Sequence, residues 1–109
     1  MKIVIIGAGY VGLVSGVCFS EFGIETTVVD NDPLKIEKLK QGIVPIYEPG
    51  LGSLMAKNMA AGHLAFSDDL TAVVPDADAV FIAVGTPSRR GDGHADLSYV
   101  YQSARDIAP

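Results

Sequence analysis

The stretch VIIGAGYVGLVSG, residues 4–16, decides between a membrane or export segment and a strand that turns into a nucleotide-binding loop. Lys2 is the only charged residue among the first twenty, so the apolar content of this region fits both interpretations. The stretch contains four glycines, Gly7, Gly9, Gly12 and Gly16. Each of them weakens an apolar helix, and no small-residue cleavage site follows. The order of the residues therefore favours a loop between a strand and a helix, and no membrane association is expected.

Length and composition indicate one globular domain outside the nucleic-acid-binding class. The 109 residues suit a single core, and 49% of them are hydrophobic against 19% charged. The formal net charge of -5 argues against a phosphate-backbone partner, because nucleic-acid binders usually carry a basic patch. The sequence has one cysteine, Cys18, which excludes an internal disulfide and fits a reducing compartment. We therefore expect a cytoplasmic protein without a nucleic-acid partner.

Hydrophobic patterning predicts alternating strands and helices. Residues 2–6 form a short β-branched run typical of a buried parallel strand, and residues 25–30 form a second one. Between them, a helix that ends at Gly23 is expected to bury one apolar stripe. That stripe consists of Val11, Val14, Ser15, Cys18, Phe19 and Phe22. Cys18 is therefore expected to be a packing residue rather than a nucleophile.

The same alternation continues to the end of the sequence. Asp32 is expected to cap a helix that begins at Pro33 and ends at Gly42. The later predicted elements are a helix through Leu51, Leu54, Met55 and Met59, a strand near 64–67, a short helix capped by Ser67, a strongly buried strand over 77–84 and a helix over 97–107. This order predicts an α/β fold with a doubly wound, mostly parallel sheet. Because that fold type carries more strands, residues 1–109 are interpreted as the amino-terminal domain of a longer protein, truncated after the fourth main strand and its helix.

The segment GAGYVG has the form G-x-G-x-x-G, follows a predicted strand and opens a predicted helix. In a Rossmann-type fold, Gly7 makes the tight turn, Gly9 lets a pyrophosphate approach the backbone, and Gly12 permits close helix packing. The amides near Tyr10 and Val11 lie at the start of the helix, where N–H groups cannot pair within the helix itself and the helix dipole favours an anion. The motif is weak by itself and gains weight from the residues that follow.

Asp30 strengthens this interpretation, because it lies eighteen residues after Gly12 at the end of the second predicted strand. A carboxylate there accepts the hydroxyls of an adenine ribose and repels a 2′-phosphate, so NAD is favoured over NADP. Lys35, in the next helix, can reach the same end of the cofactor. The alternatives are a turn-forming role for Asp30 and a solvated surface position for Lys35. Asp30→Ala is expected to weaken NAD binding and to leave the fold intact.

A further cofactor contact is predicted at Thr86. In a sheet ordered 3-2-1-4, the strand that ends at Val84 neighbours the first strand, so residues 85–87 lie beside the glycine loop. A turn-forming threonine is the alternative. The remaining polar candidates, His63, His94 and Glu48, show no ligand or nucleophile–base spacing. The sequence therefore predicts no catalytic residue and no metal site.

Four segments carry a more specific pattern, namely GAGYVG, VVDND with Lys35, IVPIYEPGL and FIAVGTPS. Together they resemble the amino-terminal domain of UDP-glucose 6-dehydrogenases, in the UDP-glucose/GDP-mannose dehydrogenase family. The resemblance runs over nearly the whole sequence and implies an NAD-dependent, two-step oxidation of UDP-glucose to UDP-glucuronate. It also implies that four residues contact the cofactor, namely Val11, Asp30, Lys35 and Thr86. The catalytic cysteine, lysine and glutamate of that family, and its sugar-nucleotide pocket, belong to later sequence.

The resemblance further implies that UDP-glucose binds through the later part of the protein, that the intact protein is a homo-oligomer, and that this fragment alone is inactive. A GDP-mannose or other UDP-sugar dehydrogenase is an alternative within the family. A non-catalytic NAD-sensing module begins with a similar glycine loop and acidic residue, although the segment IVPIYEPGL is unexpected there. A hydroxy-acid dehydrogenase is a third alternative, which a carboxyl-terminal substrate domain would settle.

Overall fold

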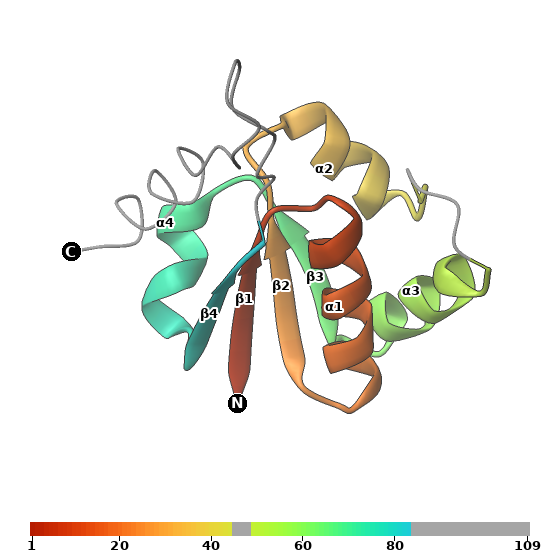
Figure 1. The fold of residues 1–109 in the computed structure, drawn as a ribbon, viewed down its shortest axis with the longest axis horizontal. Coiled ribbons are helices and arrows are strands. Elements are labelled where there is room, and N and C mark those ends of the chain that lie inside the picture. Colours follow the sequence, from red (N-terminus) through yellow and green to blue (C-terminus); the bar gives the residue numbers. More distant parts are fainter. Residues whose placement is uncertain (45–48, 84–109) are drawn as a thin grey trace, which may run out of the picture.

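The computed structural model describes residues 1–44 and 49–83, which build one four-stranded parallel sheet in the order β3-β2-β1-β4. The strands are β1 (Lys2–Ile6), β2 (Glu25–Val29), β3 (Leu64–Ser67) and β4 (Ala79–Ile82). The helices are α1 (Tyr10–Glu21), α2 (Pro33–Lys40), α3 (Leu51–Ala60), α4 (Leu70–Val73) and the 3-10 helix η1 (Val74–Asp76). Figure 1 shows α1 lying across β2 and β3 with α3 beside it, and α4 next to β4.

Alternate residues of the strands pack into two separate hydrophobic cores, one on each face of the sheet. Ile3, Ile5 and Val28 belong to the larger core, together with buried side chains of α1, α2 and α3. Val4 and Ile6 point the other way and pack with apolar residues of α4 and η1. Helices thus cover both faces of a parallel sheet, which confirms the predicted doubly wound α/β fold.

The strand register brings three chain segments together at the carboxyl ends of the strands. Ile6, the last residue of β1, pairs with Val29 of β2 and with Ile82 of β4. The chain therefore leaves all three strands at the same level, at Gly7, Asp30 and Ala83. Since β2 and β4 flank β1 on opposite sides, the direction of winding reverses here, and such a point is where ligands bind in this fold type.

The predicted cap of α2 and the predicted ends of α1, α2 and α3 are confirmed. Asp32 caps α2 by accepting hydrogen bonds from the amides of Leu34 (3.1 Å) and Lys35 (3.3 Å). The first three helices each end before a glycine with positive φ, at Gly23 (84°), Gly42 (84°) and Gly62 (81°). None of the helices in the described ranges is both long and apolar enough to cross a membrane.

The prediction of the buried face of α1 is correct for only part of the stripe. Val11 is 64% exposed, Phe22 is 82% exposed and Cys18 is also exposed, whereas Val14 and Phe19 are partly buried and pack against the larger core. The buried residues are Gly12, Leu13, Gly16, Val17 and Ser20. Both sides of α1 are apolar, and the glycine-bearing side packs on the sheet because it allows the closest approach. Apolar spacing alone could not identify that side.

Two smaller predictions also need correction. The short helix α4 is capped by Asp69, which accepts from the amide of Ala72 (3.3 Å), whereas Ser67 accepts from the amide of Asp69 (3.0 Å). Strand β4 is half-buried rather than strongly buried, with Phe81 46% exposed, because β4 lies at the edge of the described sheet. The predicted helix over 97–107 lies outside the described residues.

Candidate functional site

The glycine loop begins with a turn that requires a glycine. Gly7 follows the last residue of β1 and has φ of 109°, in the region that side chains disfavour. Its amide donates to the carbonyl oxygen of Val29 at 2.7 Å, which ties the turn to the end of β2. The chain can therefore reverse direction within a few residues and start α1 directly above the sheet.

Gly12 is required by packing inside the protein. A Cβ at this position would lie 1.7 Å from the carbonyl oxygen of Gly7 and 3.5 Å from the Cβ of Ala83. No side chain fits at such a distance from a backbone atom. The first turn of α1 therefore rests directly on the glycine loop, and the spacing between them is fixed by the absence of a side chain.

Gly9 is different, because nothing inside the described protein requires a glycine there. It occupies the cap position of α1 with φ of -75° and ψ of -165°, an extended conformation that any residue adopts. A Cβ would have no neighbour within 4 Å among the described residues. As far as residues 1–44 and 49–83 are concerned, the space in front of Gly9 is open, as close approach of a ligand to the backbone demands.

The amino end of α1 suits an anion. Gly9 has no side chain that could cap the helix, and the first turn of α1 contains no acidic residue. The partial positive charge of the helix end is therefore not offset by a side chain of its own first turn. A phosphate group placed in the open space before Gly9 would accept hydrogen bonds from the backbone there.

Asp30 links this loop to the end of β2. Its carboxylate accepts hydrogen bonds from the amide of Ala8 (3.0 Å) and from the amide of Asp32 (3.0 Å). The bond to Ala8 was not predicted from the sequence. The register that pairs Ile6 with Val29 places residues 8 and 30 close together, but it does not say which amide the carboxylate accepts from.

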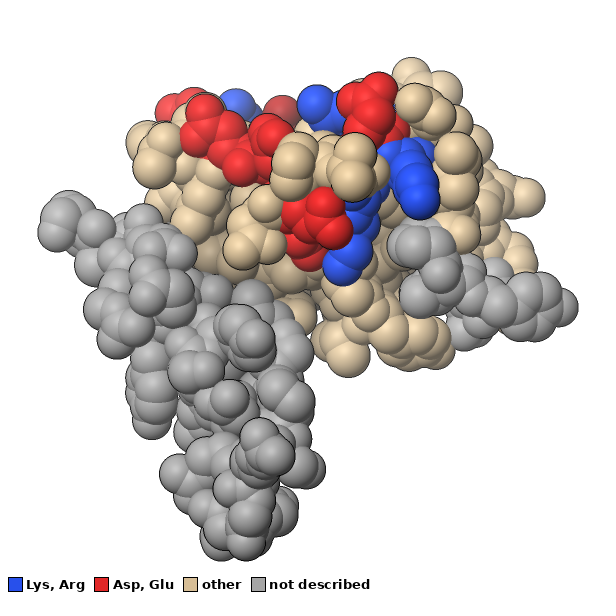
Figure 2. Space-filling view, turned by 90° about the horizontal axis from the view of Figure 1, so that it is seen from above, with Lys and Arg blue, Asp and Glu red and all other residues tan. Residues whose placement is uncertain are grey.

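The Asp30 carboxylate can still bind a ligand. Its side chain is 13% exposed, and each of its oxygens accepts one backbone hydrogen bond although a carboxylate oxygen has two acceptor positions. Lys35 Nζ lies 3.6 Å from Asp30 Oδ2 and is partly exposed, so this ion pair is weak and the lysine can turn to a ligand. Figure 2 looks onto this end of the molecule and shows acidic and basic side chains close together on its surface.

The structure brings together seven of the eight predicted cofactor residues. The glycine loop supplies Gly7, Gly9, Tyr10, Val11 and Gly12, and the next strand and helix supply Asp30 and Lys35. Thr86 lies outside the described residues, as do Glu48 and His94. Within residues 1–44 and 49–83, no group of three metal-binding side chains is present.

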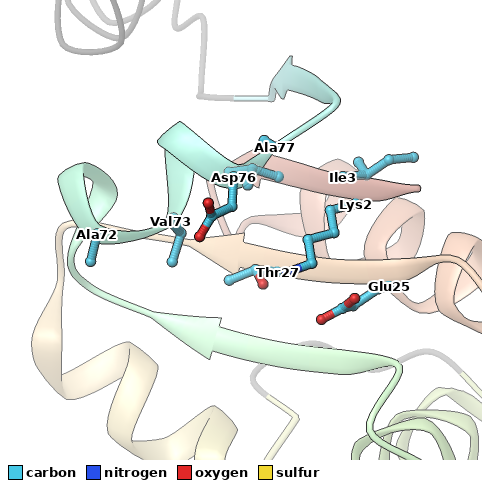
Figure 3. Close-up of a pocket in the computed structure, with 9 residues that line it drawn as sticks. Lys2, Ile3, Glu25, Thr27, Ala72, Val73, Asp76 and Ala77 are labelled. Carbon is cyan, nitrogen blue, oxygen red and sulfur yellow. The ribbon is translucent and has the colours of Figure 1, made fainter.

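A separate hollow lies at the opposite end of the sheet, near the start of β1 and β2 (Figure 3). Lys2, Glu25, Thr27 and Asp76 border it, and its volume is 130 Å³. Ligand pockets usually measure about 300–1,000 Å³, and a dinucleotide needs an extended crevice. The hollow is therefore not a second candidate for the cofactor site.

The fold and the arrangement of loop, helix end and acidic residue define a dinucleotide-binding domain of the Rossmann type. The family described as "UDP-glucose/GDP-mannose dehydrogenase family, NAD binding domain" matches residues 1–109. The chain belongs to this family, and its cofactor is NAD.

Among curated relatives, the chain is 66% identical to UDP-glucose 6-dehydrogenase of Rhizobium meliloti over 108 residues, covering 99% of this chain and 25% of the relative. It is 48% identical to UDP-glucose 6-dehydrogenase TuaD of Bacillus subtilis, covering 97% of this chain and 23% of that protein. The chain thus spans about a quarter of the length of these relatives.

Solved structures give the same result for the fold. A ternary complex of GDP-mannose dehydrogenase from Pseudomonas aeruginosa matches with a TM-score of 0.93 and 42% identity, covering 98% of this chain and 24% of that one. A UDP-glucose dehydrogenase from Pyrobaculum islandicum matches with a TM-score of 0.91 and 40% identity, covering 97% of this chain and 24% of that one. These neighbours confirm the dehydrogenase-type Rossmann fold.

Proposed function

We propose that this chain is the NAD-binding part of a UDP-glucose 6-dehydrogenase, which oxidises UDP-glucose to UDP-glucuronate in two NAD-dependent steps. The 66% identity to the Rhizobium meliloti enzyme supports UDP-glucose as the substrate. GDP-mannose is the second candidate, because the chain is 42% identical to a GDP-mannose dehydrogenase of solved structure. The higher identity favours UDP-glucose.

The open space before Gly9, at the uncapped end of α1, is the observation that supports the cofactor-binding assignment most strongly. The pyrophosphate of NAD would lie there, accept hydrogen bonds from the backbone near Tyr10 and Val11, and gain from the helix dipole. Gly7 and Gly12 shape the turn that presents these groups. When bound, NAD supplies the acceptor for a hydride from the substrate.

Asp30 would bind the other end of the adenosine diphosphate. Its carboxylate has free acceptor capacity for the two ribose hydroxyls, and its charge would repel the 2′-phosphate of NADP. Lys35 would exchange its ion pair with Asp30 for a contact with the cofactor. Thr86 would add a hydroxyl at the neighbouring strand end. Together these groups orient NAD across the end of β1.

The chain itself is proposed to bind and orient NAD without catalysing the oxidation. UDP-glucose and the catalytic groups would belong to the rest of the enzyme, which is proposed to be a cytoplasmic homo-oligomer without nucleic-acid or membrane partners. The single cysteine of this chain, Cys18, lies on the outer side of α1 and fits no catalytic role here.

An assay of the complete protein that carries this domain tests the proposal. UDP-glucose should drive NADH formation with two NADH per sugar consumed, and GDP-mannose should be oxidised far more slowly. Faster turnover of GDP-mannose would transfer the assignment to the second candidate. Binding of NAD without oxidation of any nucleotide sugar would indicate a sensing module instead.

A further inference from the structure

Asp68 follows the last residue of β3 and lies near Asp30, the residue proposed to bind the ribose of NAD. The strand register pairs Val29 with Ser67, so Asp30 and Asp68 each come directly after a paired residue. The amide of Asp30 also donates to the carbonyl oxygen of Ser67 at 3.1 Å. The two acidic residues therefore lie at neighbouring strand ends, on the same end of the sheet as the glycine loop.

The order of the strands indicates where the base of NAD would lie. The pyrophosphate is proposed to lie at the start of α1, above the end of β1, and the adenosine ribose at Asp30, after β2. The phosphates and the base leave a ribose from opposite sides of its ring, so a cofactor that runs from β1 to β2 continues towards β3. Neighbouring strands are only about 4.8 Å apart, a distance that the base spans. Adenine would thus lie beside the turn that follows β3.

One face of β3 leaves room for the base. On the side of the larger core, Leu64 and Phe66 are covered by buried side chains of α2 and α3. On the opposite side, Ala65 is exposed and Ser67 is half-buried, so the described residues leave this side of β3 largely uncovered. The base can therefore reach the turn after β3 from the uncovered side.

The turn holds two acidic residues, which differ in what they contact. Asp69 caps α4, and its Oδ1 accepts hydrogen bonds from Thr71 Oγ1 (2.8 Å) and from the amide of Ala72 (3.3 Å). Asp68 is exposed, and within residues 1–44 and 49–83 its carboxylate makes no hydrogen bond or ion pair. Because an ionised carboxylate can only accept hydrogen bonds, Asp68 suits a ligand group that donates one.

We propose that Asp68 is a specificity-determining residue for the base of NAD: its carboxylate accepts a hydrogen bond from the exocyclic amine of adenine. This inference rests on the proposed positions of the pyrophosphate and the ribose. The exocyclic amine of adenine is a donor, whereas hypoxanthine carries a carbonyl oxygen, an acceptor, at the same place. Asp68 would therefore attract the first base and repel the second.

Calorimetric titration of the complete protein with NAD and with nicotinamide hypoxanthine dinucleotide tests the proposal. The two ligands share the ribose and the pyrophosphate, so the ratio of their affinities reports on the base alone. We expect the unchanged protein to bind NAD about tenfold more tightly, as a hydrogen bond to a charged group allows. In Asp68→Asn the side chain both donates and accepts, so the two dinucleotides should bind with nearly equal affinity.

Asp76→Asn is the matched control. It removes the same charge from an exposed residue beside the hollow at the opposite end of the sheet (Figure 3). A general effect of net charge would change the affinities of both dinucleotides by the same factor, so this variant should keep the preference of the unchanged protein for NAD.

Three outcomes would overturn the proposal. The unchanged protein could bind both dinucleotides equally, Asp68→Asn could keep the full preference for NAD, or Asp76→Asn could lose the preference as Asp68→Asn does. Asp30→Ala tests the underlying position of the ribose separately, because it should weaken both dinucleotides by the same factor. If it weakens neither, the proposed cofactor placement fails and this inference fails with it, a result distinct from a failure at Asp68.

Discussion

Gly9 and Gly12 belong to the same six-residue loop, but the described structure requires glycine only at position 12. At Gly12 a side chain would collide with the carbonyl oxygen of Gly7, so the requirement comes from the protein. At Gly9 a side chain would meet no described neighbour within 4 Å, and the proposed need for glycine there comes from the pyrophosphate of NAD. The two residues can therefore be separated by measuring stability and binding independently.

Gly12→Ala is expected to destabilise the domain by about 3 kcal/mol, because the added methyl overlaps a backbone atom that cannot move without opening the turn at Gly7. Urea unfolding followed by circular dichroism measures this loss. A transition midpoint equal to that of the unchanged chain would contradict the packing role.

Asp30→Ala is expected to lower NAD affinity by about tenfold or more, because bonds to a charged acceptor are lost. The structure adds a cost that the sequence did not predict. The amides of Ala8 and Asp32 lose their acceptor, which should reduce stability by about 1–2 kcal/mol. Calorimetric titration and urea unfolding give the two values. Unchanged NAD affinity would exclude Asp30 from the site.

At the scale of the elements, a polar contact fastens α3 to the end of α1. Glu21 accepts hydrogen bonds from Lys57 Nζ (2.7 Å) and from Asn58 Nδ2 (2.8 Å), and Asn58 is buried between the helices. Hydrogen bonds from Lys57 and then from Asn58 lower the pKa of the Glu21 carboxyl. The charged form of Glu21 is thus the one that holds α3 in place.

This contact predicts a pH dependence of stability. Because the pKa of Glu21 is lower in the folded state, its contribution to stability is present above the pKa of the unfolded chain and is lost as the pH falls through the lower folded pKa. In Glu21→Gln, the free energy of unfolding should therefore fall less steeply as the pH is lowered through the acid range. Glu25→Gln, a change of the same kind at an exposed strand residue, is the control. Identical acid profiles for Glu21→Gln and the unchanged chain would contradict this role.

The elements also show what the sequence could and could not predict. Strand positions, helix caps such as Asp32 and helix ends such as Gly42 follow from local chemistry and are confirmed. The buried side of α1 does not, because Val11 and Phe22 are as apolar as Leu13 and Val17. Close packing of Gly12 and Gly16 on the sheet decides it, and that depends on atoms from other strands.

At the scale of the whole molecule, the strand order β3-β2-β1-β4 assembles the site. The parallel register aligns the ends of β1, β2 and β4. The strand pairing alone therefore brings the glycine loop and Asp30 close together. The motif and its spacing were therefore enough to predict that the loop and Asp30 lie together, and NAD binding by these residues stays a prediction. The bond between Asp30 and the amide of Ala8 was not predictable, because it depends on the path of the loop.

A ligand that bridges the ends of β1 and β2 should stabilise the entire fold. At a free NAD concentration one hundred times its dissociation constant, the expected gain is about 2.7 kcal/mol. NADP at the same concentration should give a much smaller gain, because its 2′-phosphate faces the Asp30 carboxylate. Thermal unfolding with each dinucleotide measures the difference, and equal stabilisation by both would contradict the proposed orientation.

The most direct test of the account is Gly9→Ser, measured for both stability and NAD binding. A serine at the cap of α1 would meet no described neighbour and is at least as good a cap as glycine. The free energy of unfolding should therefore stay the same or rise by roughly a few tenths of a kcal/mol. The same side chain occupies the space proposed for the pyrophosphate. Calorimetric titration should therefore show that NAD binds about tenfold more weakly or worse. Full stability with unchanged NAD affinity would place the cofactor elsewhere and contradict the account.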